Sequence, residues 1–182
     1  MRRHLSRFLM VAGALLLLKG GLAVYPFLFS VLSAEIAEIP QSRVHGTERL
    51  FPGEPVFRLS IPRHNARFTV VEGTTTTALR EGPGPLEGSA LPGQPGNVVV
   101  AGHRDTHFLA LKNVLIGDEI RIASEGAEYL YRVVDVRVVS PRDTSVLRPQ
   151  ARDALTLITC YPFRFTGPAP DRYVVRALLF DQ

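Results

Sequence analysis

The one cysteine of the chain is the side chain best suited to covalent chemistry. Cys160 ends an apolar, strand-like run that begins at Ala154, and the turn-forming residue Pro162 follows shortly after it. A nucleophilic thiol must be held rigidly at the edge of a site beside a basic or cationic group, and a strand end provides such a position. A free cysteine is nevertheless more often a small, inert and buried residue. Cys160 alone is therefore open to both interpretations.

The segment after Cys160 predicts a cationic partner for the thiol. Residues 161–171 are rich in proline and glycine, so the apolar run 173–180 should fold back beside the cysteine strand. Arg172 would then lie roughly opposite Cys160, and facing side chains of paired strands are about 5 Å apart. We expect the Arg172 guanidinium to stabilise a developing oxyanion or to bind substrate carbonyl groups.

A third strand end predicts the acid and base. The apolar run 97–102 ends in His103, and an imidazole is the usual side chain for proton transfer near neutral pH. Taken singly, His103 and Arg172 also have ordinary structural interpretations. The combination of imidazole, thiol and guanidinium at three strand ends predicts nucleophilic catalysis, with Cys160 as nucleophile, His103 as general acid and base, and Arg172 as stabiliser.

A metal site is not expected beside these residues. His103 and His107 stand four residues apart, faintly like the zinc-binding pattern His-Glu-x-x-His, but Arg104 occupies the place of the glutamate. The pair also follows a strand, so no helix would bring both imidazoles to one face. We expect no metal and no cofactor, and we expect His107 and Asp105 to shape the loop, to orient His103 or to lie on the surface.

Short strand candidates separated by breakers predict an all-β fold closed on itself, with a few short helices. The alternation is clearest where Ile120 and Ile122 face away from Glu119 and Arg121. Short helices or single turns are predicted at 74–80 and 109–114, and a loop at 82–96. The strand candidates are residues 56–61, 67–72, 97–102, 119–123, 128–139, 154–160 and 173–180.

Three segments of the chain resemble signature blocks of the sortases, which are membrane-anchored cysteine transpeptidases of bacterial envelopes. They are Ala101 to Phe108 (AGHRDTHF), Leu155 to Cys160 (LTLITC) and Ala169 to Val175 (APDRYVV). The resemblance extends from about Glu54 to Leu179 and is strongest to class D sortases. It implies an eight-stranded β-barrel of the sortase type.

The resemblance also implies a substrate class. The partners would be secreted proteins with a C-terminal sorting signal like Leu-Pro-x-Thr-Gly or Leu-Pro-x-Thr-Ala, and an amine of peptidoglycan or its precursor. The thiolate would attack the threonine carbonyl and form a thioacyl enzyme. Two alternatives stay open: a catalytically silent sortase-like barrel that binds wall or partner peptides, and a pilin-polymerising sortase. The segment before the domain lacks the Asp-Pro-aromatic lid motif of pilin-polymerising enzymes, which favours general surface-protein anchoring.

The N-terminal part predicts a membrane anchor. Residues 1–7 form a basic leader, residues 8–32 an apolar transmembrane signal-anchor, and residues 33–54 an extracytoplasmic tether before the catalytic domain, 55–182. The continuous apolar run 8–18 is short for a span of about 20 residues, so a cleaved signal peptide is the alternative. The basic leader should stay in the cytoplasm and leave the domain outside, with membrane lipid as a further partner.

Composition excludes several other classes. The chain has 182 residues, 46% of them hydrophobic, which suffices for one domain and an anchor. A single cysteine excludes an intramolecular disulfide. The net charge of +4 is mild, and neither a nucleic-acid footprint nor a phosphate loop is visible, so we expect no nucleic-acid partner. No role is assigned to His4, His45 or His64.

Overall fold

The computed structural model of the chain describes residues 51–148 and 151–182. The predicted leader, the membrane segment and most of the tether lie outside the described residues. Within the described part, no helix is both long enough and apolar enough to cross a membrane.

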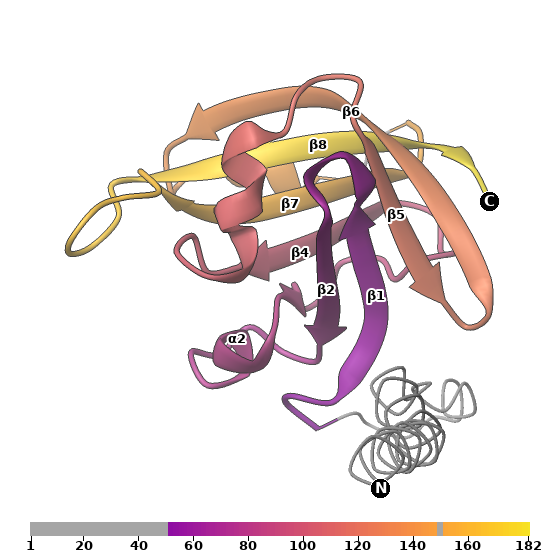
Figure 1. The fold of residues 1–182 in the computed structure, drawn as a ribbon, viewed down its shortest axis with the longest axis horizontal. Coiled ribbons are helices and arrows are strands. Elements are labelled where there is room, and N and C mark those ends of the chain that lie inside the picture. The colour runs from indigo at the N-terminus through magenta and orange to yellow at the C-terminus, as the bar shows by residue number, and fades with distance from the viewer. Residues whose placement is uncertain (1–50, 149–150) are drawn as a thin grey trace, which may run out of the picture. The chain divides into compact units, whose positions relative to one another are not determined.

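Eight strands form one sheet in the order β2-β1-β5-β6-β8-β7-β4-β3 (Figure 1). The strands are β1 (Pro55–Ile61), β2 (Ala66–Val71), β3 (Gly84–Pro85), β4 (Asn97–Gly102), β5 (Glu119–Ser124), β6 (Ala127–Val139), β7 (Ala154–Tyr161) and β8 (Asp171–Asp181). The short helices are η1 (Pro62–His64), α2 (Ala78–Glu81), η2 (His107–Asn113) and η3 (Thr144–Leu147), of which only α2 is α-helical.

Neighbouring strands pair antiparallel except for β4 and β7, which are parallel. A parallel pair needs a long crossover, and here the crossover contains η2, β5, β6 and η3. Because the two strands run in the same direction, their carboxyl ends meet at the same edge of the sheet.

The sheet curls until its two edge strands nearly meet. The backbone N–H of Val71, in β2, donates a hydrogen bond of 2.8 Å to the carbonyl of Pro83, directly before β3. The backbones are so close here that a Cβ added at Gly84 would lie 1.9 Å from the carbonyl oxygen of Gly73. The barrel is therefore nearly closed, by a close backbone approach and not by a continuous strand ladder, which corrects the expectation of a fully closed sheet.

The interior of the barrel is filled by the inward face of every long strand. Ile120 and Ile122 are fully buried, while Glu119 and Arg121, which alternate with them, are partly exposed, which confirms the predicted alternation. The core cluster also contains Leu155, Leu157, Val98, Val100, Val175, Ala177, Phe108 and Tyr131. This inward set identifies the opposite face of β4, β7 and β8 as the outer one.

The seven predicted strands are all present, and their ends differ by at most two residues from the prediction. Strand β3 was missed, because Gly84–Pro85 is only two residues long and lies in a segment rich in breakers that predicted a loop. Helix η3 was missed as well. The predicted turns near 74–80 and 109–114 correspond to α2 and η2.

Candidate active site

Cys160 and Arg172 lie directly opposite each other in the β7–β8 pair. Alternation along β7 places Cys160 on the same face as Ile158 and Thr156, away from the core residues Leu155 and Leu157. The thiol is partly exposed. The predicted pair therefore lies on the outer face, at the carboxyl end of β7.

His103 follows the last residue of β4 at the same edge. In the parallel β4–β7 pair, Ala101 is opposite Ile158 and Gly102 is opposite Thr159, so His103 and Cys160 occupy the next positions of the two chains. Neighbouring strands are about 4.8 Å apart, and residues opposite each other share a face. The structure thus brings all three predicted site residues to one edge of one face.

A close approach of backbone and ring fixes this edge. The hydroxyl of Thr159 donates a hydrogen bond of 2.7 Å to the carbonyl of Gly102. The ring of Phe108 is fully buried against Gly102, where an added Cβ would lie 2.8 Å from a ring carbon. A glycine directly before His103 is therefore required for η2 to pack back against β4.

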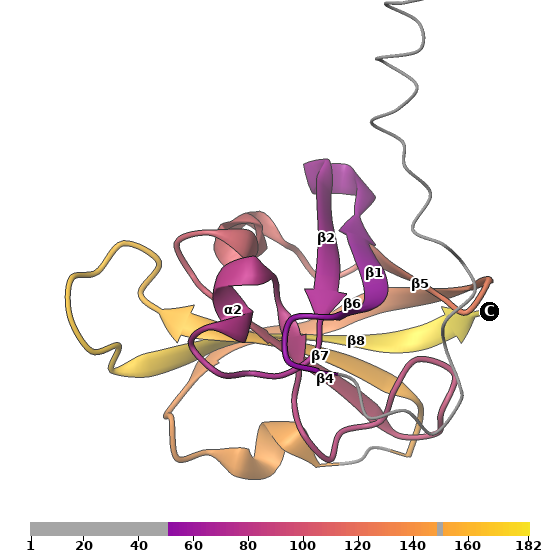
Figure 2. The same ribbon diagram turned by 90° about the horizontal axis from the view of Figure 1, so that it is seen from below.

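An apolar floor extends from the cysteine along the same face. Its members are Ile158 on β7, Val174 on β8, and Val99 and Ala101 on β4, of which Val99 and Val174 are buried. In Figure 2 the β6–β7 connection, in orange, runs across the side of β4, β7 and β8 that faces away from β1 and β2. The connection with η3 therefore forms a wall over part of this face, and Ile158 and Ala101 are the apolar residues that stay partly exposed beside Cys160.

A buried polar network holds this wall in place. The Asn97 amide donates to the carbonyls of Val146 and Leu147, both at 3.3 Å, and accepts a bond of 2.8 Å from the Thr156 hydroxyl. Arg176 donates from Nη2 to the same Val146 carbonyl at 2.7 Å. Burial lowers the pKa of the Arg176 guanidinium. The acceptors in η3 are backbone carbonyls, which every residue carries, so the sequence pattern gives no signal for them.

The β7–β8 loop, residues 162–170, borders the other side of the cysteine. Its beginning is fixed by an aromatic cluster, in which the Phe163 ring lies 4.9 Å from that of Tyr173 and 6.0 Å from that of Tyr161. At its end, Nη1 of Arg172 donates to the carbonyls of Asp171 at 2.9 Å and Ala169 at 3.4 Å. One nitrogen of the predicted stabiliser thus binds the loop.

The remaining candidates near His103 have weaker contacts. His107 begins η2, and its Nε2 lies 3.4 Å from the carbonyl oxygen of Arg80, while Asp105 is exposed. Within the described part of the chain, no group of three or more His, Cys, Asp or Glu side chains could hold a metal ion. The arrangement at this edge is one of thiol, imidazole and guanidinium.

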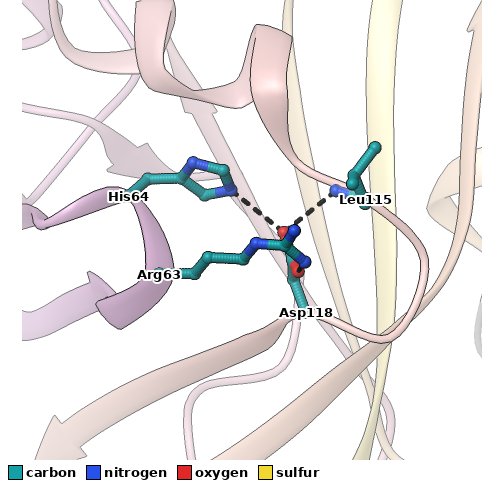
Figure 3. A network of polar contacts seen from close by, with 4 residues as sticks. All are labelled: Arg63, His64, Leu115 and Asp118. Atoms are coloured by element: carbon teal, nitrogen blue, oxygen red, sulfur yellow. Dashed lines mark hydrogen bonds and ion pairs between the residues drawn. The ribbon is translucent and has the colours of Figure 1, made fainter.

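His64, for which the sequence indicates no role, belongs to a polar network away from this edge (Figure 3). The carboxylate of Asp118 is only 2% exposed and accepts hydrogen bonds from His64 Nε2 at 2.9 Å and Arg63 Nη1 at 2.8 Å. The backbone N–H of Leu115 donates a third bond at 3.0 Å. These bonds tie the β1–β2 turn to the segment before β5, so the role of His64 is structural.

Comparison with known proteins agrees with this geometry. The family model described as the sortase domain matches residues 59–180. Over 118 residues the chain is 38% identical to Sortase D of Bacillus subtilis (strain 168), which covers 64% of this chain and 60% of that protein. The chain therefore spans less than two thirds of this relative.

Solved structures of the same kind of protein are also similar to this chain. A Clostridium perfringens sortase D5 transpeptidase superimposes with a TM-score of 0.66 at 29% identity, covering 73% of this chain and 83% of that one. Clostridium perfringens sortase C, solved with the C-terminal cell wall sorting motif, gives a TM-score of 0.66 at 27% identity, covering 74% of this chain and 75% of that one.

Proposed function

The chain belongs to the sortase family, and from that premise we propose that it is a membrane-anchored cysteine transpeptidase of the cell envelope. Its substrates would be secreted proteins that carry a C-terminal sorting signal of the Leu-Pro-x-Thr-Gly or Leu-Pro-x-Thr-Ala kind. The acceptor would be an amine of peptidoglycan or of its lipid-linked precursor. The single observation that carries the proposal is the register that sets Cys160 opposite Arg172 and beside the end of β4.

The first half of the reaction forms a thioacyl enzyme. The Cys160 thiolate attacks the threonine carbonyl, a carbon–sulfur bond forms, and the negative charge moves to the carbonyl oxygen. Arg172 retains donors beyond Nη1 for this oxyanion, since a guanidinium has five N–H groups. His103, as imidazolium, donates a proton to the departing amine as the carbon–nitrogen bond breaks.

The second half reverses these steps with a new amine. The neutral imidazole of His103 accepts a proton from the incoming amine, which attacks the thioester carbonyl. The carbon–sulfur bond breaks, the thiolate returns, and an amide joins the secreted protein to the envelope. Water in place of the amine would give hydrolysis.

The apolar floor supports the substrate class. An extended peptide bound with its threonine at Cys160 would pass its leucine and proline over the partly exposed Ile158 and Ala101 toward η3. Burial of apolar area favours this direction by about 25 cal/mol per Å². The relative solved with a C-terminal cell wall sorting motif belongs to the same family, which also supports the proposal.

The proposal is tested with the full chain in detergent and a panel of sorting-signal peptides plus an amine acceptor. Products are followed by mass spectrometry, with Cys160→Ala as the control. Cysteine-dependent formation of an amine-linked product would support transpeptidation and name the motif. Hydrolysis alone would indicate a peptidase, and peptide binding without turnover by the wild-type chain would support the silent, peptide-binding barrel instead.

The choice between surface-protein anchoring and pilin polymerisation depends on the acceptor. Transfer to peptidoglycan-like amines would support anchoring. Transfer only to a lysine side chain of a second secreted protein would support polymerisation.

A further inference from the structure

The side chain of Arg104, directly after His103, reaches the β7–β8 loop. Its Nη2 donates hydrogen bonds to the carbonyls of Phe165 at 2.7 Å and Gly167 at 3.3 Å. The guanidinium carbon also lies 5.7 Å from the centre of the Phe165 ring, within the range of a cation–π contact. One arginine from the end of β4 thus contacts both the backbone and a side chain of the middle of the loop.

One nitrogen of this partly exposed side chain is covered, which argues against an incidental surface contact. Nη1 of Arg104 is shielded from solvent and has no hydrogen-bond partner among the described residues. A covered donor without a partner costs free energy, so the other contacts of the group must outweigh that cost. A solvated surface arginine would show neither feature.

The middle of the loop depends on Arg104 more than its ends do. The beginning is fixed by the Phe163 ring in the aromatic cluster, and the end by the bonds of Arg172 to Ala169 and Asp171. The residues between, 164–168, are exposed and belong to no strand. Arg104 is therefore the side chain that reaches this middle segment from the end of β4.

The loop lies on the acceptor side of the site, an assignment that rests on the proposed function. The apolar half of the sorting signal would occupy the floor between Cys160 and η3. The bond to be broken, and later the incoming amine, would then lie beyond Cys160 on the side where residues 162–170 begin.

We propose that Arg104 is a positioning residue that holds the β7–β8 loop where the acceptor amine enters. A held loop orients the amine toward the thioester and limits the access of water, because correct orientation lowers the barrier for the attacking group. Arg104 therefore favours transfer over hydrolysis of the thioacyl enzyme and leaves thioester formation largely unaffected.

The test compares Arg104→Ala, Arg104→Lys and Arg164→Ala in the full chain. Arg164 is an exposed arginine of the same loop, so its removal takes the same charge from the same region. We measure the rate of thioester formation, the ratio of transfer to hydrolysis products at one acceptor concentration, and hydrogen exchange of residues 162–170.

For Arg104→Ala we expect the transfer-to-hydrolysis ratio to fall about tenfold, as for the loss of charged hydrogen bonds, with faster exchange in the loop. Arg104→Lys should recover part of the ratio, since an ammonium can still donate to a carbonyl, and Arg164→Ala should behave as the wild type. If Arg104 were merely structural, its loss would slow thioester formation, transfer and hydrolysis equally. The transfer-to-hydrolysis ratio would then stay unchanged.

Three results would overturn the inference: an unchanged ratio, an unchanged exchange rate in the loop, or an equal effect of Arg164→Ala. A wild-type chain that forms no thioester would instead contradict the proposed function, and the acceptor-side assignment with it. The exchange measurement would still decide whether Arg104 holds the loop, so the two failures are distinguishable.

Discussion

At the scale of single residues, the N–H donors of Arg172 have two sets of possible partners, the loop carbonyls and a substrate. Arg172 uses Nη1 for the carbonyls of Asp171 and Ala169, so the guanidinium is oriented before any substrate arrives. A donor group held in advance stabilises an oxyanion without reorganisation at the moment of reaction. The planar shape of arginine lets one nitrogen bind the loop while the others keep their donors, and the register sets Arg172 opposite Cys160.

Replacement of Arg172 by lysine should therefore separate the effect of the positive charge from the effect of the hydrogen-bond geometry. A lysine keeps the positive charge but cannot bind the loop and an oxyanion at once, so we expect kcat for a sorting peptide to fall about 100-fold. Steady-state kinetics and thermal unfolding would be measured together, with Arg164→Lys as the matched control. A kcat within a few-fold of the wild type in a folded variant would show that charge alone suffices.

The sequence allowed the three reactive groups to be proposed because each stands at the end of an apolar run. Their assembly depends on strand register. The breaker-rich connection, residues 162–170, folds β8 back beside β7 and so sets Cys160 opposite Arg172. Arg104 and Arg176 could not be found in this way. Their partners are backbone carbonyl oxygens, which every residue carries, so no pattern of residue types points to them.

At the scale of elements, polar networks attach connections to the barrel. Asn97, Thr156 and Arg176 hold η3 against the outer face, and Asp118 holds the β1–β2 turn against the start of β5. Regular strands were predictable from alternation alone. The positions of η1 and η3 were not, because they depend on these long-range contacts between residues about 30 to 60 positions apart.

The Asp118 network predicts a loss of stability in acid. Burial opposes ionisation of this carboxyl, but the hydrogen bonds from Leu115, His64 and Arg63 outweigh it and hold the pKa of Asp118 below its ordinary value of 3.8. A carboxyl whose pKa is lower in the folded state stabilises the fold fully above the ordinary value. That contribution is lost as the pH falls through the folded-state pKa.

Asp118→Asn tests this. At pH 7 we expect the free energy of unfolding to fall by about 2 kcal/mol, because an amide cannot accept all three hydrogen bonds. The difference between variant and wild type should begin to shrink below about pH 4, where Asp118 of the unfolded wild-type chain starts to protonate, and should shrink further as the pH falls through the lower folded-state pKa. Urea denaturation from pH 3 to pH 7 measures both quantities. Asp105→Asn, at an exposed carboxyl, is the control, and a pH-independent difference would contradict the explanation.

At the scale of the whole domain, closure of the barrel depends on a close approach between backbones. The eight strands were expected from the family resemblance, and seven of them from the sequence pattern, but the way in which the edges meet was not. Closure at β2 and β3 requires that Gly84 carry no side chain, which is a property of the assembled barrel and not of the local sequence.

Gly84→Ala should therefore destabilise the fold far more than substitution of a glycine whose added Cβ would meet open space. Its Cβ would overlap the carbonyl of Gly73, so we expect a loss of more than about 3 kcal/mol, in the exceptional range for a single substitution. Gly88→Ala is the control, because nothing lies within 4 Å of its added Cβ and only the positive φ of 77° is strained. That strain costs about 1–2 kcal/mol. Equal losses in chemical denaturation would show that the β2–β3 contact does not limit stability.

The proposed orientation of the chain in the membrane can be tested through its single cysteine. Since Cys160 is partly exposed and no other thiol exists, a membrane-impermeant maleimide reports the position of the domain alone. The basic leader should keep the N-terminus in the cytoplasm, so the maleimide should label the chain in intact spheroplasts or protoplasts. Cys160→Ala should remain unlabelled, and a cytoplasmic protein with an exposed cysteine controls for leakage. Labelling only after permeabilisation would place the domain inside the cell, where a transpeptidase of the envelope could not reach its acceptor.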